Sequence, residues 1–451
     1  MSDATPPAIT VRDPLWDTIR LDATAVRIVD SAAFQRLRYI RQLGLAYLIY
    51  PGATHTRFDH ALGVYHLAQR ALSVMAEQGG LAGVDPVERR LVPLAGLLHD
   101  IGHYPYSHAI EELEEGRIPG HHEALVGRFL ADPDVREALE EVAPDGPARI
   151  EALIRGRSES PLQGLVSGSL DLDKIEYLKR DARFCGVPYG EVDVDRLLYA
   201  LVVLEDPETG RPEVGVLEKG VAALESLLFS KYQMFRNVYW HHAVRAATAM
   251  YKRIVADALD AGLLDPEDLV GRTDEALLFA LEWKAREGVL RGGEVAEAAA
   301  RIGRWLEMLR ARRLPKRAAE VVAAELDGDE VGRWLIHDTP LKRRVEERLA
   351  RELALEPGAA FLDYPEKPAM FGLNLLVRRG SGAVIRLGPG GRAGLIGLPR
   401  VADSLYQTAR VLRLFTLGER RRVDPAAVAR LALLSDAEIE QRLASAEPLL
   451  A

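Results

Sequence analysis

The pattern of hydrophobic and polar positions predicts a chain built mainly from helices. Residues 60–75 and 91–98 are apolar on almost every side of a helix, which is typical of helices buried inside a bundle. Residues 32–44 predict a further helix with an apolar stripe, and the pattern stays amphipathic and helical over residues 273–355. We therefore expect residues 1–355 to form one helical domain.

A smaller lobe is predicted at the C-terminus, where the composition changes. Short apolar runs alternate there with glycine-rich turns and predict strands at residues 371–377, 383–387 and 394–396. Residues 402–417 then predict a helix. We expect residues 356–451 to form a small α+β lobe, so that the fold class is mainly α, a helical bundle with this lobe at its end.

Two short stretches within the helical part have the character of strands. Residues 9–22 divide into two extended pieces around a turn at Asp13–Pro14. Residues 197–218 contain two apolar runs that flank the turn DPETGRP. Each stretch predicts a pair of strands joined by a turn.

The composition is that of an ordinary globular protein. Of 451 residues, 48% are hydrophobic and 28% charged, and no apolar run approaches the roughly 20 residues that cross a bilayer. The start lacks the features of a signal peptide and Cys185 is the only cysteine, so we expect a soluble, cytoplasmic protein without membrane contact. A net charge of -9 argues against coating nucleic acid by bulk attraction, although local basic patches could still grip phosphates.

The apolar run at residues 91–98 leads directly into His99 and Asp100, and more histidines follow. Burying this pair costs free energy unless a partner balances the charge, and both side chains are good ligands for zinc, manganese or iron. Of 11 histidines, eight lie between His55 and His122. We therefore predict a metal site here. For the dipeptide by itself, the alternative is a simple hydrogen-bonded pair.

A second dense stretch, residues 164–183, places polar groups on one side of a predicted helix. Tyr177 and Asp181 follow Asp173 at helical spacing, with Lys174 at the edge of the same face. This face is too polar for a core stripe. Asp173 could complete the metal shell, and the alternative is an exposed network of ion pairs.

Other polar groups near these stretches are also candidates. His60 stands in the first turn of its predicted helix, and Arg57 precedes it by three residues. His122 and Glu123 could be acid–base groups or extra ligands, or a pair at a helix start in water. Residues 231–242 combine cations with aromatic rings, which suits nucleotide phosphates and bases, although tyrosine and tryptophan in a helix more often belong to the core.

The order His60, His99–Asp100, Asp173 resembles the HD superfamily of metal-dependent phosphohydrolases. The surrounding segments FQRLRYIRQLG, YPGATHTRFDHALGVYHLA, LLHDIGHYPYSHAIE, HHE and DLDKIEYLKRDA resemble, more specifically, the deoxynucleoside triphosphate (dNTP) triphosphohydrolases. This family includes the sterile-alpha-motif/HD type and bacterial dGTPase-like proteins. The resemblance extends from about Val11 to His242 and implies an HD-domain helical bundle. It also implies hydrolysis of a dNTP to deoxynucleoside and inorganic triphosphate.

The resemblance assigns the metal ligands and the catalytic groups. The metal ligands would be His60, His99, Asp100 and Asp173, and the divalent cation manganese, magnesium, iron or zinc. The catalytic residues would be His108, near the leaving group, with His103, His122 and Glu123 around it. His108 would donate a proton to the departing sugar oxygen after attack by an activated water at the α-phosphorus.

The resemblance also assigns a substrate pocket. The residues that match the family's sugar and phosphate contacts are Gln42, Leu43, Arg57, Lys174, Tyr177, Asp181, Lys231 and Tyr239. Leu43 and Tyr239 match residues that crowd the sugar 2′ position and so exclude ribonucleotides. Lys231 stands where the family often has arginine, and Phe235 stands where the animal members have histidine.

An activator site at a subunit interface is a further implication. The matching residues for a GTP or dNTP activator are Asp30, Gln35, Arg38, Lys219 and His241. Arg12, Leu217 and Ala223 depart from the family's pattern at this site. We expect a homo-oligomer, a dimer or a tetramer, whose assembly and activity respond to nucleotide.

Two other functions are compatible with the sequence. The first is an HD-type phosphodiesterase or nuclease acting on cyclic nucleotides or single-stranded nucleic acid, with His103, His121 or His122 recruited to a second metal. The second is a nucleotide-binding regulator with an inactive HD site, which the complete set of ligands argues against. Metal counting and a substrate panel distinguish these functions from dNTP hydrolysis.

Overall fold

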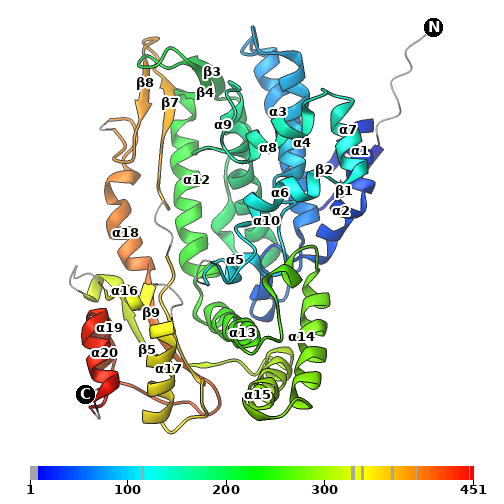
Figure 1. Cartoon of the computed structure of the whole chain (residues 1–451). Helices are drawn as coiled ribbons and strands as arrows, with labels where there is room; N and C mark the ends of the chain where they lie inside the picture. Colours follow the sequence, from blue (N-terminus) through cyan, green and yellow to red (C-terminus); the bar gives the residue numbers. More distant parts are fainter. Residues whose placement is uncertain are drawn as a thin grey trace.

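Helices dominate the computed structural model, which describes residues 9–113, 116–326, 331–336, 340–366, 370–392, 394–445 and 447–450. Long helices lie along the upper part of the molecule in Figure 1, and α13 to α15 lie below them. The small sheets take strands from the N-terminal hairpin, from the middle of the chain and from its C-terminal part. The prediction of a mainly α fold with a small α+β part is confirmed.

The α-helices described are α1 (Ala23–Asp30), α2 (Ala32–Gln35), α3 (Arg57–Glu77), α4 (Pro86–Leu98), α5 (Ser107–Ile110), α6 (His122–Leu130), α7 (Pro133–Glu140), α8 (Gly146–Ile154), α9 (Gln163–Val166), α10 (Leu172–Cys185), α11 (Val194–Leu198), α12 (Val221–Met234), α13 (His242–Asp260), α14 (Asp274–Val289), α15 (Gly293–Arg310), α16 (Arg333–Ile336), α17 (Pro340–Glu352), α18 (Ala402–Ala409), α19 (Pro425–Ala432) and α20 (Asp436–Ala444). Shorter helical turns are η1 (Arg36–Tyr39), η2 (Gly44–Leu48), η3 (Pro188–Gly190), η4 (Glu218–Gly220), η6 (Pro266–Leu269), η7 (Ala323–Leu326) and η8 (Leu398–Val401), and η5 (Phe235–Tyr239) is a π-helical turn.

Local sequence signals set the ends of the three helices that carry the site. Asp59 accepts hydrogen bonds from the backbone and hydroxyl of Thr56 at the start of α3. Helix α4 starts with Asp85 as its cap and Pro86 in its first turn. Asp171 caps α10 by accepting from the backbone N–H of Lys174. The polar side chains that follow or begin these helices are therefore held at defined points.

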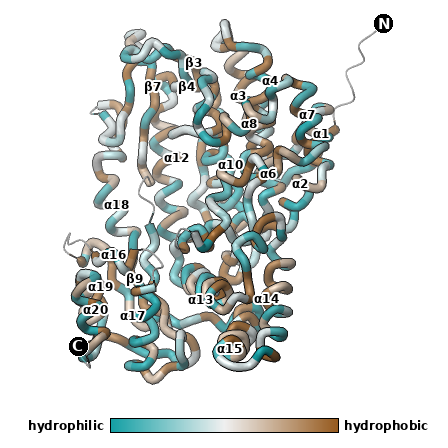
Figure 2. Tube along the Cα trace, viewed as in Figure 1, coloured by the Kyte–Doolittle hydropathy of each residue, from teal (hydrophilic) through white to brown (hydrophobic). Residues whose placement is uncertain are grey.

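The helical core has two main apolar clusters. The first joins α3, α4 and α10 with the N-terminal hairpin, and the second joins α13, α14 and α15. Figure 2 shows hydrophobic positions along α14 and α15, where the second cluster lies. Helix α4 buries every residue from Leu91 to Leu98, as its sequence predicts. Among the described residues, no helix is long and apolar enough to cross a membrane.

Within the described ranges, three sheets accompany the helices. Strands β1 (Ile9–Asp13) and β2 (Asp17–Leu21) form the antiparallel N-terminal hairpin. The other sheets have the orders β3-β4-β7-β8 and β5-β9-β6, with the bounds β3 (Leu201–Glu205), β4 (Pro212–Leu217), β5 (Lys316–Val322), β6 (Ala360–Asp363), β7 (Leu375–Arg378), β8 (Val384–Leu387) and β9 (Val411–Thr416). Both of these sheets take strands from each side of residue 355. The division into two domains, 1–355 and 356–451, stays a prediction.

Three local predictions were wrong in part. Residues 402–417 were predicted as one helix but form α18 and then the strand β9. The prediction failed because a fully buried apolar run has no periodicity that distinguishes a strand from a helix. The helix predicted at residues 32–44 ends early as α2 and η1, and Arg41 pairs with Thr56 in an isolated bridge. Residues 394–396 contain no strand, and Ile396 makes only a single bridge to Arg392.

Candidate metal centre

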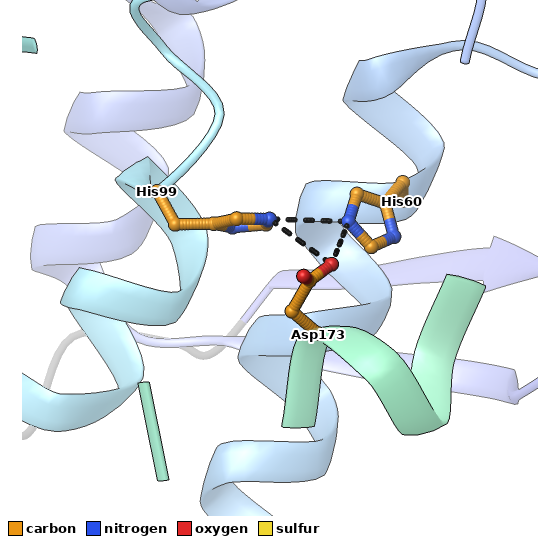
Figure 3. Close-up of side chains that lie close together, drawn as sticks. All are labelled: His60, His99 and Asp173. Atoms are coloured by element: carbon orange, nitrogen blue, oxygen red, sulfur yellow. Dashed lines mark hydrogen bonds and ion pairs between the residues drawn. The ribbon is translucent and has the colours of Figure 1, made fainter. Parts of the chain in front are cut away.

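Three of the predicted metal ligands converge from three helices. His60 lies in the first turn of α3, His99 directly follows α4, and Asp173 lies in the first turn of α10. Their side chains point towards one another in Figure 3. The Nε2 atoms of His60 and His99 are 3.1 Å apart, and Asp173 Oδ1 lies 3.0 Å and 3.6 Å from them.

The donor atoms of these residues fit a divalent cation. His60 donates its Nδ1 proton to Glu176 and His99 donates its own to the carbonyl of Gly96, so each ring turns an Nε2 lone pair inward. Two lone pairs and a carboxylate oxygen facing one another are repulsive unless positive charge lies between them. Atoms bound to one cation at about 2.1 Å are about 3.0 to 3.4 Å apart, close to the separations found.

The electrostatics of the cluster lead to the same conclusion. Burial lowers the pKa of His60, but the neighbouring carboxylates of Asp173 and Glu176 favour a positive charge on the ring and raise its pKa to about 10. Burial raises the pKa of Asp173, but His60 and His99 hold it well below its usual range. The site therefore favours positive charge among these side chains, as a divalent cation would supply.

Asp100, the fourth predicted ligand, lies beside this cluster. Its carboxylate is 3.3 Å from His99 and 3.8 Å from His60. It is closer to Arg57, at 2.7 Å, and to His103, at 3.0 Å. Burial raises the pKa of Asp100, yet Arg57 and the neighbouring histidines hold it well below its ordinary value. Asp100 is therefore ionised and available to a cation, although Arg57 shares it.

The predicted catalytic histidines also come together. The ring of His103 stacks on that of His122 with centroids 3.6 Å apart, and His108 lies edge-on to both. His103 is buried, accepts from the hydroxyl of Ser107 and faces Asp100, whereas the His108 side chain is 64% exposed. Glu123 is exposed in the first turn of α6. The arrangement gives one buried and one accessible imidazole beside the metal cluster.

Glu111 was not predicted, although it organises these histidines. Its Oε1 accepts from His122 Nδ1 at 2.8 Å, and its Oε2 lies 3.4 Å from His108 Nδ1. Burial raises the pKa of Glu111, but the two histidines hold it far below its usual range. The signal was present in the sequence, because Glu111 follows His108 by three positions, one helical turn.

Two of the predicted sugar-binding residues, Tyr177 and Asp181, lie on the same helix as Asp173. Asp181 accepts a hydrogen bond from the hydroxyl of Tyr239 at 2.6 Å and another from His55 at 2.8 Å. Tyr177 lies between Asp173 and Asp181 in the sequence of α10, and burial together with nearby carboxylates raises its pKa well above the ordinary value. His55 had no predicted role, and it holds the carboxylate that Tyr239 contacts.

The predicted phosphate cations occupy different settings. Arg57 is buried on Asp100, and its Nε has no hydrogen-bond partner among the described residues. Lys174 bonds to Asp171 and to the carbonyl of Gly168. Lys231 is buried in α12. Each cation is thus held by the protein before any substrate phosphate arrives.

Two predicted pocket residues, Gln42 and Leu43, lie just before η2. The buried Oε1 of Gln42 has no hydrogen-bond partner among the described residues. Leu43 packs against a small apolar cluster of Ala46, Ala53 and Val244. An unpaired buried carbonyl costs free energy, so Gln42 is a candidate to bind a ligand donor.

The predicted activator residues fall in two separate parts of the chain. Asp30 ends α1, Gln35 donates to the carbonyl of Val29 and accepts from Arg38, and Arg38 stacks on the ring of Phe58. Lys219 lies in η4. His241 caps α13, and burial with neighbouring cations lowers its pKa to about 4. Their joint role stays a prediction.

Two parts of the chain match models of known protein families. Residues 57–164 match the HD domain model, and residues 192–388 match the HD associated region model. The chain is 36% identical to an uncharacterized protein of Methanocaldococcus jannaschii over 272 residues, 60% of this chain and 54% of that protein. It is 28% identical over 263 residues to the deoxynucleoside triphosphate triphosphohydrolase SAMHD1 of Homo sapiens, 51% of this chain and 41% of that protein.

A solved structure supports the fold. A phosphohydrolase from Bacteroides thetaiotaomicron superposes with a TM-score of 0.67 at 21% identity, covering 91% of this chain and 100% of that chain, which shows the fold alone. The aligned segments span about half the length of the curated relatives. The fold and the site define an HD-domain protein with an HD-associated region. The chain is similar to HD-domain proteins that include deoxynucleoside triphosphate triphosphohydrolases.

Proposed function

We propose that the protein hydrolyses dNTPs to deoxynucleosides and inorganic triphosphate. The observation that carries the proposal is the spacing of two carboxylates on α10. This helix bears the metal ligand Asp173 and, two turns later, Asp181, which is hydrogen-bonded to Tyr239. Eight helical residues span about 12 Å. A ligand that touches both ends must be extended and must carry a group for a metal and a group for hydrogen bonds, as a nucleotide does.

The residues of the site have complementary tasks. A divalent cation bound by His60, His99, Asp100 and Asp173 would polarise the phosphate and lower the pKa of a bound water to about 7. Arg57, Lys174 and Lys231 would neutralise the triphosphate. His108 faces Glu111 with its Nδ1, which would donate to that carboxylate. As the imidazolium it would carry a second proton on Nε2 and would pass that proton to the sugar oxygen that leaves. His103, His122 and Glu123 would support this transfer.

The pocket would select a deoxyribose. Leu43 and Tyr239 would crowd the 2′ carbon, and Tyr177 and Asp181 would contact the sugar. Gln42 offers its unpaired buried carbonyl to the ligand. Rejection of a ribonucleotide would then rest on steric exclusion of the 2′-hydroxyl.

Regulation by nucleotide is part of the proposal. Asp30, Gln35, Arg38, Lys219 and His241 would bind a GTP or dNTP activator between copies of the chain. Measuring the mass of the protein with and without GTP and dNTPs tests this point. Assembly and activation are expected on addition of nucleotide, and an unchanged mass and rate would contradict it.

A direct assay tests the proposed reaction. The purified protein is incubated with each dNTP, singly and mixed, with manganese or magnesium, and the products are separated by chromatography. Deoxynucleoside and triphosphate in equal amounts are expected from wild type, and neither from His99→Ala. Release of pyrophosphate or of a monophosphate would contradict the proposed bond cleavage.

A second candidate is an HD-type phosphodiesterase or nuclease. Asp100, His103 and His122 place ligand atoms within 4.8 Å of one another, beside the first cluster, as a second metal would require. Two bound ions per chain together with cleavage of cyclic nucleotides or single-stranded DNA would favour this function. One ion with triphosphate release favours the dNTPase.

A further inference from the structure

The metal ligand His60 is oriented by a buried carboxylate behind it. Glu176 is fully buried and its Oε2 accepts the Nδ1 proton of His60 at 2.7 Å. A carboxylate in this position fixes the histidine tautomer, holds the ring plane and makes Nε2 a stronger ligand. The cation-binding atom of His60 therefore depends on how firmly Glu176 is held.

Glu176 is held from the N-terminal hairpin. Its Oε1 accepts from the indole N–H of Trp16 at 2.9 Å and from Arg180 at 2.7 Å. Arg180 is itself fully buried and donates to Asp13 Oδ2 at 3.0 Å. Trp16 and Asp13 both belong to the turn that joins β1 to β2, so two of the contacts in this network originate about 45 residues before His60 in the sequence.

The hairpin turn is built to present Trp16. Asp13 Oδ1 accepts the backbone N–H groups of Leu15 and Trp16, both at 2.8 Å, and Asp17 has a positive φ of 60°. Ile19 of β2 is fully buried in the main core and anchors the hairpin. The indole thus reaches Glu176 from a rigid turn and not from a loose terminal segment.

The neighbouring helix leaves room for this contact. A Cβ atom at Gly63 would lie 1.9 Å from Glu176 Oε1, so only glycine allows the carboxylate to sit against α3 one turn beyond His60. The HD domain match covers Gly63 and His60 but includes none of Asp13, Trp16 and Glu176. The metal site is completed by segments outside that match.

We propose that the N-terminal hairpin is a functional part of the metal site, with Trp16 as a positioning residue that acts on His60 through Glu176. The inference rests on the cation site and not on the identity of the substrate. Removing an outer-shell partner of a metal ligand typically weakens metal binding by about 10- to 100-fold. Trp16 acts one contact further away, so we expect an effect towards the lower end of that range.

The test is the affinity for Mn²⁺ measured by calorimetry on the full chain. Trp16→Phe keeps an aromatic ring and removes only the N–H donor, and it should weaken Mn²⁺ binding by about 10-fold. Glu176→Gln should weaken it more, and in that background Trp16→Phe should have little further effect. Ile19→Val is the matched control, because it loosens the same hairpin without touching Glu176 and should leave the affinity unchanged.

The outcomes separate a positioning role from packing. Wild-type affinity in Trp16→Phe would overturn the proposal, and so would an equal loss of affinity in Ile19→Val at a matched melting temperature. If Glu176→Gln does not fold, the comparison of Trp16→Phe with Ile19→Val still decides. A chain that binds Mn²⁺ as described but releases no triphosphate would refute the proposed dNTPase activity and leave this inference intact.

Discussion

Arg57 donates to Asp100 at 2.7 Å, so a predicted phosphate-binding cation is bound to a predicted metal ligand. Both side chains are buried, Arg57 in the first turn of α3 and Asp100 in the turn after α4. The guanidinium is therefore fixed at the edge of the cation site. A substrate phosphate that bridges the cation and Arg57 would meet two positive charges already in place.

This relationship predicts separate effects on substrate and metal for Arg57→Gln. Loss of the positively charged guanidinium should raise the KM for dNTPs by about 10-fold or more, since charged hydrogen bonds contribute about 1.5 to 3 kcal/mol. Mn²⁺ affinity should not fall, because a positive charge beside Asp100 has been removed. Steady-state kinetics and calorimetry measure the two effects.

The matched control is Arg70→Gln on the same helix. Arg70 is partly exposed and pairs with Asp195 on the surface. It should leave both KM and metal affinity unchanged. Equal changes in the two variants would show that Arg57 acts only through stability.

Much of the site could be predicted from sequence because its residues stand at fixed points of strong helices. His60, His99 and Asp173 lie at helix starts or ends that caps and apolar runs mark clearly, and these three converge as expected. Glu176 and Glu111 were missed, because their importance depends on which side of a helix faces a neighbouring element. That information arises only when the helices pack.

The fold shows the same limit. The helical core and the hairpins followed from periodicity and turns, whereas β9 was predicted as part of a helix. This strand is buried over its whole length between β5 and β6, so no polar face revealed its period. Pairing between strands more than 90 residues apart, as for Lys316 and Thr416, left no local signal.

His108 and His121 offer a test of the proposed acid. Their side chains are 64% and 65% exposed, and both lie near Glu111. His108→Asn should lower kcat by about 10²- to 10⁴-fold with little change in KM, the usual contribution of a general acid. His121→Asn should stay near wild type. Similar losses in the two variants would contradict the assignment of the acid to His108.

The buried carboxyl group of Asp274 should make the free energy of unfolding depend on pH. It is buried at the start of α14, and burial raises its pKa from 3.8 to about 6. The folded state therefore binds more protons than the unfolded state between these values, and stability falls as the pH rises through this window by at most about 3 kcal/mol. Asp274→Asn should melt higher than wild type at pH 7.5, and this difference in melting temperature should be clearly smaller at pH 5.

The control for this prediction is Asp403→Asn, at an exposed position of α18. Its melting temperature should differ from wild type by a similar small amount at both pH values. If the difference in melting temperature between Asp274→Asn and wild type does not grow from pH 5 to pH 7.5, burial does not disfavour ionisation of this carboxyl. Differential scanning calorimetry provides the measurement.

A buried ion-pair network links the segment that follows α5 to strand β6. Arg245 of α13 bonds bidentately to Glu112, next to Glu111, and also to Asp363 of β6. Breaking a buried pair leaves uncompensated charge, so Arg245→Ala should lower the free energy of unfolding by about 3 to 5 kcal/mol. Urea denaturation checks this value.

Arg304 provides the comparison, because its pair with Glu356 is exposed on both sides. Arg304→Ala should change the free energy of unfolding by less than about 1 kcal/mol. A loss in Arg245→Ala no larger than in Arg304→Ala would contradict the view that the network joins the two parts of the chain.

The central claim is that His60, His99 and Asp173 bind one divalent cation on which hydrolysis of dNTPs depends. Its most direct test is the metal content and the triphosphate release of the same preparation, wild type beside Asp173→Ala. Wild type is expected to hold one ion per chain and to release triphosphate from dNTPs, and a folded Asp173→Ala is expected to do neither. Full metal content and full turnover in Asp173→Ala would contradict it.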